Sequence, residues 1–529
     1  MTRFNLFKSL LLVFGIVFLY SCEVLEEENI IPLEEENTSS ENATSAANLR
    51  TTPARVLING VPLSYTAAQP YQPAYNDNGT VMVSASAIFS ALDWNVGWNQ
   101  AAQRVTLTKN GTTIYLWINS TIAQVNGTNV TLPKAPVIVN NRTMVPVRFV
   151  SEYAGAKVEW DQESQSVQIY YWNKLDYGIY FYDSEPGSEG SWDAVGCQKY
   201  VPGQANRFFD PSKPTILYVH GFQLGGVANH NRESFHLNDF GANIHTQNKW
   251  KQDGYNVAIF HWVQFADDGF LPPDNVEIKI YSATGGVGMR WKRLDGSFVT
   301  HSTTKTMADL FADEYQKVFN SSYSGGRIHV MGNSLGGNLT MAGMVELHER
   351  NQPSSRMPQR LTLIDPYWSQ NRLYAGSNQL PYGAWDTKDF GGIATEMMYN
   401  NYNMAIEYFR TSLAGQQGTS ERAVKQAAFI HFGTGFTNVG GTVAKHTVPV
   451  RQYMWSKNFA APTEVSRDFA WQDFTPTGLI AASATTPDWR IRQMMGQNTG
   501  NSYKHWNHIE GRDTVNPSDD TFEVRNGHF

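Results

Sequence analysis

The chain has 529 residues, of which 41% are hydrophobic, so it is long enough for more than one domain and for a large core. Its formal net charge of −7 argues against a nucleic-acid partner, because such proteins present a strongly basic face. Only two cysteines occur, which excludes a small scaffold held together by disulfides.

Residues 1–22 have the pattern of a signal peptide. Arg3 and Lys8 precede an apolar stretch, Leu10 to Tyr20, that is too short to span a bilayer comfortably. The last four residues, LYSC, resemble the lipobox of bacterial lipoproteins, whose cysteine carries the lipid. The resemblance implies an extracytoplasmic protein at the bacterial cell surface, anchored to the membrane through Cys22. A plain secretory signal and an uncleaved anchor remain alternatives.

Residues 23–53 are predicted to be an acidic tether. Glu23 to Leu49 contains eight glutamates and no Lys, Arg or Asp, so it cannot bury enough apolar surface to order itself. Removing Arg3 and Lys8 changes the net charge from −7 to −9, and removing the eight glutamates then leaves −1. The body from Arg50 onward is therefore almost neutral.

Residues 54–172 contain an internal repeat with an offset of 62 residues. Val81–Leu107 matches Thr143–Ile169, and the matched positions include both a valine pair and a tryptophan pair, Trp98 with Trp160. Each copy is predicted to form a short helix and then two strands joined by a turn, with both copies sharing one core. The two tryptophans are predicted to fill that core, and a ligand-binding role is the alternative.

The second copy, TMVPVRFVSEYAGAKVEWD, resembles the copper amine oxidase N-terminal-like domain, and the likeness covers about Val56 to Tyr171. That module is common on bacterial surface proteins, which implies a partner in the cell envelope. Copper chemistry is rejected, because the chain has no His-x-His pair and no Cys, Asp or Glu ligands are grouped around His505 and His508.

Residues 173–460 contain a serine between a predicted strand and a predicted helix. Gly332-Asn333-Ser334-Leu335-Gly336 lies between an apolar strand, Arg327 to Met331, and a segment with helical spacing of apolar residues. A G-x-S-x-G sequence at a strand-to-helix turn is a nucleophile elbow. The turn places Ser334 at a helix N-terminus, where backbone N–H groups without partners favour developing negative charge.

The residues predicted to bind the oxyanion come from two places. One N–H belongs to Leu335, directly after the nucleophile, and the other to Phe222. Phe222 follows an apolar strand, Thr215 to Val219, through His220 and Gly221. We expect His220 to brace this loop by hydrogen bonds.

The acid and the base are expected further along the chain. Asp365 follows the strand Arg360 to Ile364 and can orient a histidine, and Glu407 is an alternative one strand later. His446 is the predicted base, in a loop past the last strands. His431 lies within a strand pattern and is interpreted as structural, while His505 and His508 are weaker candidates.

The order Ser334, Asp365, His446 is that of α/β-hydrolases. His446 would take the Ser334 proton and return it to the leaving group, while Asp365 fixes the imidazole tautomer. This chemistry needs no metal and no organic cofactor.

Four blocks, YVHGF, MGNSLGG, TLIDPYW and KHTVPVRQYMWS, resemble the catalytic blocks of the pancreatic-type lipase family. The resemblance covers roughly Pro214 to Ser456 and implies hydrolysis of an ester or lipid substrate with the same triad and oxyanion hole. The sequence departs from that family at two points. Asn333 stands where histidine is common, and the disulfide-closed lid of the animal enzymes is absent. The resemblance therefore does not decide which substrate is cleaved or whether a lid covers the site.

The predicted fold is an α/β-hydrolase with a mostly parallel sheet, preceded by a smaller α+β repeat domain. Two aromatic-rich inserts, Gln264–Thr304 and Tyr367–Asn403, either cover the active site or pack onto the body. Residues 461–529 carry no recognisable motif. Two other functions remain open: an amidase or peptidase with the same triad, and a non-catalytic envelope-binding protein on a hydrolase scaffold.

Overall fold

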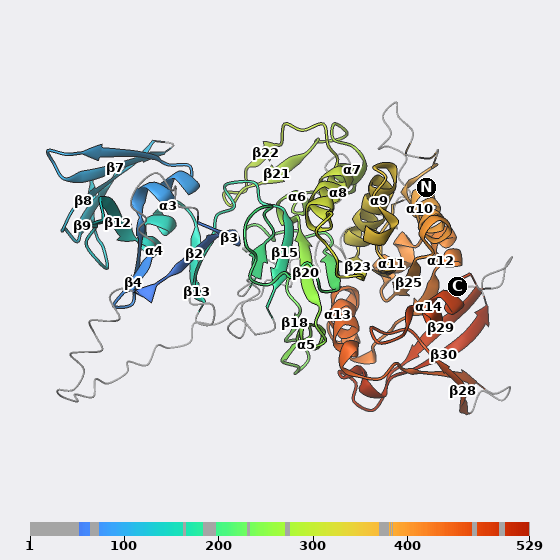
Figure 1. Cartoon of the computed structure of the whole chain (residues 1–529). Helices are drawn as coiled ribbons and strands as arrows, with labels where there is room; N and C mark the ends of the chain where they lie inside the picture. Colours follow the sequence, from blue (N-terminus) through green and yellow to red (C-terminus); the bar gives the residue numbers. More distant parts are fainter. Residues whose placement is uncertain are drawn as a thin grey trace, which may run out of the picture. The chain divides into compact units, whose positions relative to one another are not determined.

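The structure, a computed structural model, describes residues 52–63, 74–109, 111–161, 166–183, 197–229, 233–269, 276–369, 380, 382, 384–467, 473–496 and 503–527. The chain divides into two compact units, and the boundary between them lies between Lys174 and Leu175 (Figure 1). The signal peptide with Cys22, and the tether as far as residue 51, lie outside the described residues. Within the described ranges, no helix has the length and hydropathy needed to cross a bilayer.

The two copies of the repeat form the predicted helix–strand–strand units. In the first copy, α3 (Ala85–Ala91) precedes the antiparallel strands β6 (Asn95–Asn99) and β7 (Arg104–Lys109). In the second copy, α4 (Val147–Tyr153) precedes β13 (Lys157–Asp161) and β14 (Ser166–Tyr170). The prediction for this unit is therefore confirmed at the level of its elements.

The two copies meet symmetrically. The strands that precede the two helices, β5 (Thr80–Ser84) and β12 (Arg142–Pro146), pair antiparallel. Val83 lies opposite Val145, which is its equivalent 62 residues later, so the pairing has a local twofold axis. The remaining strands of this unit are β1 (Thr52–Pro53), β2 (Arg55–Ile58), β3 (Val61–Pro62), β4 (Tyr75–Asp77), β8 (Thr112–Trp117), β9 (Ile122–Val125), β10 (Thr128–Thr131) and β11 (Val137–Val139).

The prediction that both repeat tryptophans fill the core is wrong for Trp98. Its side chain is 43% exposed, whereas Trp160 is partly buried against the core of this unit. The reason is that β6 is an edge strand, all of whose residues are exposed. The indole N–H of Trp98 donates to Gln100 Oε1 at 2.8 Å rather than packing inside.

The second unit is built on a twelve-stranded sheet with the order β16-β15-β20-β17-β23-β24-β25-β26-β29-β30-β27-β28. The strands from β20 to β29 in this order run parallel. At the other edge, β15 (Gly178–Tyr182) pairs antiparallel with β20 and with β16 (Cys197–Lys199). The other strands described so far are β17 (Thr215–Val219), β20 (Asn256–His261), β23 (Ile328–Asn333), β24 (Arg360–Ile364), β25 (Ala405–Arg410) and β26 (Ala428–His431).

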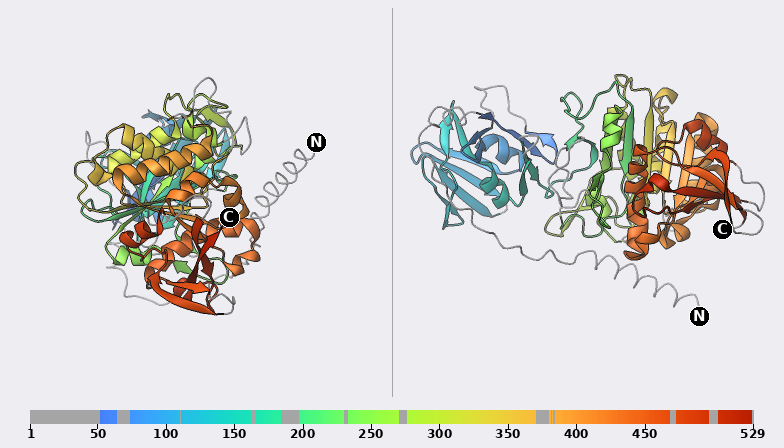
Figure 2. Two further views of the ribbon diagram at one scale, coloured as in Figure 1. Left: turned by 90° about the vertical axis from the view of Figure 1, so that its right-hand side faces the viewer. Right: turned by 90° about the horizontal axis from the view of Figure 1, so that it is seen from below.

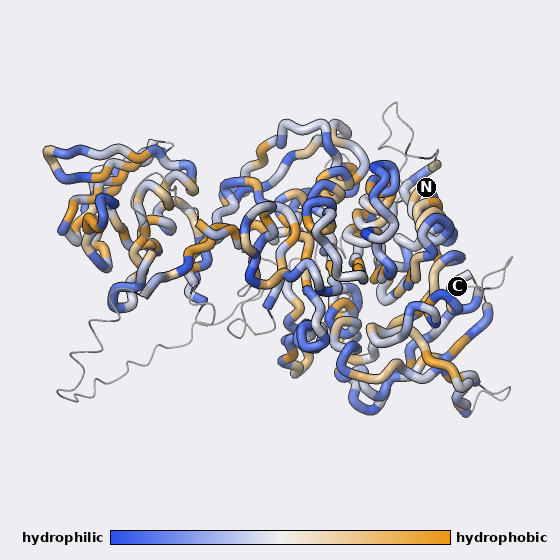
Figure 3. The backbone as a smooth tube through the Cα atoms, in the orientation of Figure 1, coloured by the Kyte–Doolittle hydropathy of each residue, from blue (hydrophilic) through white to orange (hydrophobic). Residues whose placement is uncertain are grey.

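Helices cover this sheet and complete its core. The helices α8 (Met307–Val318), α9 (Leu335–Glu349) and α10 (Thr387–Tyr402) lie together on one face (Figure 2). α5 (Asn248–Gln252) packs against the last turn of α13 (Gly441–Trp455). There the indole N–H of Trp250 donates to Met454 O at 3.0 Å. The hydropathy colouring of Figure 3 shows the central strands of this sheet as largely hydrophobic. Shorter helices in this unit are α11 (Leu413–Gly418) and α12 (Glu421–Gln426).

The segment 461–529, which no sequence motif placed, extends the sheet. It contributes β27 (Thr463–Arg467), β28 (Phe474–Ile480), β29 (Tyr503–Ile509) and β30 (Thr521–Gly527), with α14 (Asp488–Met494) between them. Its interior is partly ionic, since Glu464 accepts from Arg490 Nη2 at 2.5 Å and from the Trp506 indole at 2.6 Å. Buried charge of this kind breaks the apolar alternation by which strands are predicted.

The described parts of both inserts pack onto the body. The first insert forms α6 (Val263–Ala266), α7 (Val276–Tyr281), β21 (Arg290–Lys292) and β22 (Phe298–Thr300). Glu277 of α7 accepts from Asn338 Nδ2 in α9 at 2.9 Å and from the backbone N–H of Ser369 in the second insert at 3.0 Å.

Candidate active site

Ser334 occupies a strained turn between β23 and α9. Its backbone has φ 57° and ψ −129°, a conformation that residues with a side chain rarely adopt. The surroundings hold it there: Ser334 N–H donates to Ile364 O at 3.1 Å, and Tyr367 N–H donates to Ser334 O at 3.0 Å. This is the strand–turn–helix geometry that the G-x-S-x-G sequence predicts.

Glycines beside Ser334 allow two segments to approach closely. A Cβ atom on Gly336 would lie 2.1 Å from Val219 O, at the end of β17. A Cβ on Gly221 would lie 2.7 Å from the Ser334 Cβ. The end of β17 and the start of α9 therefore touch only because glycine occupies both positions.

The same contact brings together the two segments that carry the predicted oxyanion N–H groups. Leu335 is the first residue of α9, whose leading N–H groups have no partner inside the helix. Phe222 directly follows Gly221, the residue that touches Ser334. An oxyanion formed at Ser334 would also lie at the positive end of the α9 dipole.

His446 and Asp365 form a hydrogen-bonded pair. His446 Nδ1 lies 3.0 Å from Asp365 Oδ2, with the carboxylate fully buried and the imidazole 15% exposed. Thr411 N–H donates to Asp365 Oδ1 at 2.5 Å and so fixes the rotation of the carboxylate. With its proton on Nδ1, the imidazole presents Nε2 as the basic atom.

Glu407, the alternative acid, is committed elsewhere. Arg360 binds it through two N–H groups, at 3.0 and 2.5 Å, and both side chains are fully buried. The hydroxyls of Thr362 and Tyr453 donate to the same carboxylate at 2.7 and 2.8 Å. The structure thus brings Asp365, and not Glu407, to His446.

His446 lies in α13 and not in a loop, and four more strands follow it, so that part of the expectation is wrong. Pro449, inside the helix, has no N–H for Lys445 O. The Thr411 hydroxyl lies 2.5 Å from both Lys445 O and Asp365 Oδ2, and its single proton serves one of them at a time. The Thr411 side chain thereby partly replaces the hydrogen bond that Pro449 cannot make to Lys445 O.

Sequence reasoning missed two positioning residues. Asn333 donates through Nδ2 to Ile364 O at 2.9 Å and to His446 O at 3.0 Å, linking the turn that holds Ser334 to the helix that carries His446. Thr411 holds Asp365 as described above. For Asn333 a signal existed, since it departs from the histidine common at this place, but for Thr411 the sequence offers none.

His220 braces the loop that follows β17, as expected. It accepts from Trp262 N–H through Nε2 at 3.0 Å, and its Nδ1 lies 3.0 Å from Gly221 O. Burial lowers the pKa of His220, which is consistent with a neutral ring that both accepts and donates.

The first unit matches a known family: residues 58–169 match the copper amine oxidase N-terminal domain. No curated protein matches the chain. Several solved structures are similar to it, and three of them are described here. An esterase from Pyrobaculum calidifontis has 15% identity and a TM-score of 0.25, with 47% of this chain and 78% of that chain covered. Carboxyl esterase 2 from the fungus Tuber melanosporum has 14% identity and a TM-score of 0.24, with 47% and 77% covered. A hormone-sensitive lipase from a metagenome library has 16% identity and a TM-score of 0.20, with 42% and 66% covered.

The second unit has the α/β-hydrolase fold. Because the TM-scores are low, this assignment rests on the parallel strands around β23 and on the strained turn at Ser334. The fold class predicted from the sequence, an α/β-hydrolase with a smaller domain before it, is confirmed.

His431, in β26 of the α/β-hydrolase unit, is expected to make stability depend on pH. Burial, and then the charge of Arg410, lower the pKa of His431 to about 4, against about 6.5 in an unfolded chain. The lowered pKa means that its contribution is complete above pH 6.5 and is lost as the pH falls toward 4, at up to about 1.4 kcal/mol per pH unit.

His431→Gln keeps an acceptor for Arg410 but does not titrate. Urea unfolding at pH 7 and pH 5 should therefore show a smaller loss of stability for the variant than for the parent protein. Equal losses in both proteins would contradict this assignment.

Proposed function

We propose that the protein is a serine hydrolase that cleaves carboxylic esters, of lipase or carboxylesterase type, at the bacterial cell surface. The observation that carries the proposal is the hydrogen bond between His446 and the buried Asp365, linked through Asn333 to a serine in a strained turn. The four lipase-like blocks of the sequence favour esters over amides, since a triad by itself serves both. In this proposal Cys22 carries the membrane anchor and the repeat domain meets a partner in the cell envelope.

The reaction would proceed through an acyl-enzyme. His446 Nε2 takes the proton of Ser334 Oγ as this oxygen attacks the ester carbonyl carbon. The N–H groups of Phe222 and Leu335 stabilise the resulting oxyanion, and Asp365 stabilises the imidazolium. His446 then returns the proton to the departing alkoxide. Water, activated by the same imidazole, releases the carboxylic acid and restores the Ser334 hydroxyl.

Labelling with a fluorophosphonate probe tests this proposal. The parent protein should be labelled, and Ser334→Ala should abolish labelling and lower kcat for p-nitrophenyl esters by about 10⁴-fold or more. Ser354→Ala, at an exposed serine in the same unit, is the matched control and should leave both unchanged. A series of acyl chain lengths then separates an esterase from a lipase.

An unlabelled but folded parent protein would refute the hydrolase and favour a non-catalytic envelope-binding protein. Labelling together with faster cleavage of p-nitroanilides than of esters would instead identify an amidase or peptidase.

A further inference from the structure

The loop of residues 220–227, which follows β17, lies against residues 262–267. Trp262 N–H donates to His220 Nε2 at 3.0 Å, and the Trp262 indole donates to His220 O at 2.8 Å. These two hydrogen bonds fix the start of the loop. Phe222, whose N–H is the second oxyanion donor in the proposed reaction, follows two residues later, so its position also depends on how the rest of the loop is held.

A buried carboxylate holds the rest of the loop. Asp267 directly follows α6 and is fully buried. Its Oδ1 accepts from Gly225 N–H and its Oδ2 accepts from Val227 N–H, each at 2.9 Å. Beside them, Gln223 N–H donates to Ala266 O at 3.3 Å. Three backbone N–H groups of the loop therefore bind the carboxyl end of α6.

Packing and charge support the same contact. A Cβ atom on Gly226 would lie 2.8 Å from Val263 Cγ2, so the loop approaches α6 more closely than a residue with a side chain would allow. Lys292, in β21, donates to Asp267 Oδ1 at 2.9 Å and offsets its charge. A buried carboxylate with one cationic and two backbone donors keeps a single orientation, which is what a positioning group requires.

We propose that Asp267 is a positioning residue of the oxyanion hole. By holding Gly225 and Val227, it aims the Phe222 N–H at the carbonyl oxygen that becomes negative during the reaction. The inference rests on the hydrolase proposed above. It matters for the rate because a donor stabilises the transition state fully only if it already points at the oxyanion when the charge develops.

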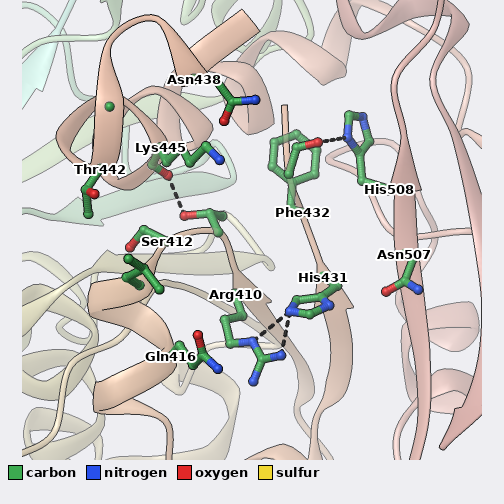
Figure 4. Close-up of a pocket in the computed structure, with 14 residues that line it drawn as sticks. Arg410, Ser412, Gln416, His431, Phe432, Asn438, Thr442, Lys445, Asn507 and His508 are labelled. Atoms are coloured by element: carbon green, nitrogen blue, oxygen red, sulfur yellow. Dashed lines mark hydrogen bonds between the residues drawn. The ribbon is translucent and has the colours of Figure 1, made fainter. Parts of the chain in front are cut away.

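The effect should be on the reaction step rather than on substrate binding. A cavity of about 560 Å³ lies beside Arg410, whose guanidinium is directed at the His431 ring (Figure 4). The described residues that line this cavity include none from 220–227 or 262–267. A substitution at Asp267 should therefore leave unchanged the cavity and any part of a substrate bound in it. Losing an interaction that is made only in the transition state lowers kcat and kcat/KM equally.

Asp267→Asn tests the inference in the full chain. The asparagine can accept one of the two N–H groups through Oδ1, but its NH2 group faces the other, so the loop should loosen. For p-nitrophenyl butyrate, kcat and kcat/KM should both fall by about tenfold or more, while KM stays within about threefold. Hydrogen exchange measured by mass spectrometry should become faster in residues 220–227. Asp267→Asn combined with Lys292→Met leaves no unpaired lysine and should give the same results if the single variant does not fold.

Asp268→Asn is the matched control, because it makes the same change at the adjacent buried carboxylate. Asp268 accepts from Lys279 Nζ at 2.8 Å and from Arg290 Nη2 at 2.6 Å, and both donors lie outside the loop. This variant should lose stability in urea. Its kcat, and its hydrogen exchange in residues 220–227, should stay close to those of the parent protein.

Unchanged exchange in residues 220–227 of Asp267→Asn would overturn the positioning role, whether or not the protein cleaves esters. Faster exchange with an unchanged kcat would overturn the role at the oxyanion. A rise in KM at constant kcat would also overturn it and would assign the loop to substrate binding. A parent protein without esterase activity would refute the hydrolase and the role at an oxyanion, whereas the exchange comparison would still decide whether Asp267 holds the loop.

Discussion

Asp365→Asn is expected to lower kcat for p-nitrophenyl butyrate by about 10⁴-fold while the protein stays folded. Thr411 N–H donates to Asp365 Oδ1 at 2.5 Å, so an asparagine there should keep its carbonyl oxygen on Thr411 and turn its NH2 group toward His446. The imidazole Nδ1 must then accept, which moves the ring proton to Nε2. A protonated Nε2 cannot remove the proton of Ser334.

Glu407→Gln is the matched control, since it makes the same change at the alternative acid. Glu407 touches Arg360, Thr362 and Tyr453. The variant should therefore lose stability and keep kcat within a fewfold for the fraction that remains folded. The opposite pattern, with activity lost at Glu407 and kept at Asp365, would show that the acid had been assigned wrongly.

Arg360→Met is expected to reduce the free energy of unfolding by about 3–5 kcal/mol, the usual cost of breaking a buried ion pair from one side. The guanidinium is fully buried and binds Glu407. It also donates to Thr486 O at 2.6 Å and to Ser483 O at 2.7 Å, both in the carboxyl-terminal segment. In the variant, the Glu407 carboxylate and the carbonyl groups of Thr486 and Ser483 lose the hydrogen bonds that Arg360 donates. The carboxyl-terminal segment that extends the sheet is then held by fewer contacts.

Urea unfolding measures this cost. The double variant Arg360→Met with Glu407→Leu should cost less than the sum of the two single variants, because it leaves no uncompensated charge. Arg422→Met, which removes an exposed pair with Glu396 at 2.5 Å, should cost less than about 1 kcal/mol. A similar small cost for Arg360→Met would show that the buried network contributes little.

The sequence reveals those parts of the site that depend on local constraints. The glycines around Ser334 are required by contacts of 2.1–2.7 Å, so the turn is visible as a motif. The strand before Asp365 is short, apolar and buried throughout, and therefore stands out. The repeat shows itself because both copies keep the same residue types at matched positions, such as Val83 and Val145.

Other parts depend on partners far away in the sequence. β29 pairs with β26 although α13, β27, β28 and α14 lie between them in the sequence, and no local pattern specifies that pairing. Trp98 is exposed because β6 has a neighbour on one side alone, which depends on the final strand order. The cavity beside Arg410 combines β25, β26, β29 and α13, so it exists only once the sheet has formed.

The pairing of Val83 with Val145 bears on how the first unit arose. Equivalent residues facing each other across a twofold axis form a contact that two separate chains, each with a single copy, would also make. Gene duplication and fusion of such a homodimer would place both partners on one polypeptide, so that their association no longer depends on concentration. Fusion would also free the two halves to diverge, and one pair of equivalent positions differs in this way, since Trp98 is exposed whereas Trp160 is partly buried.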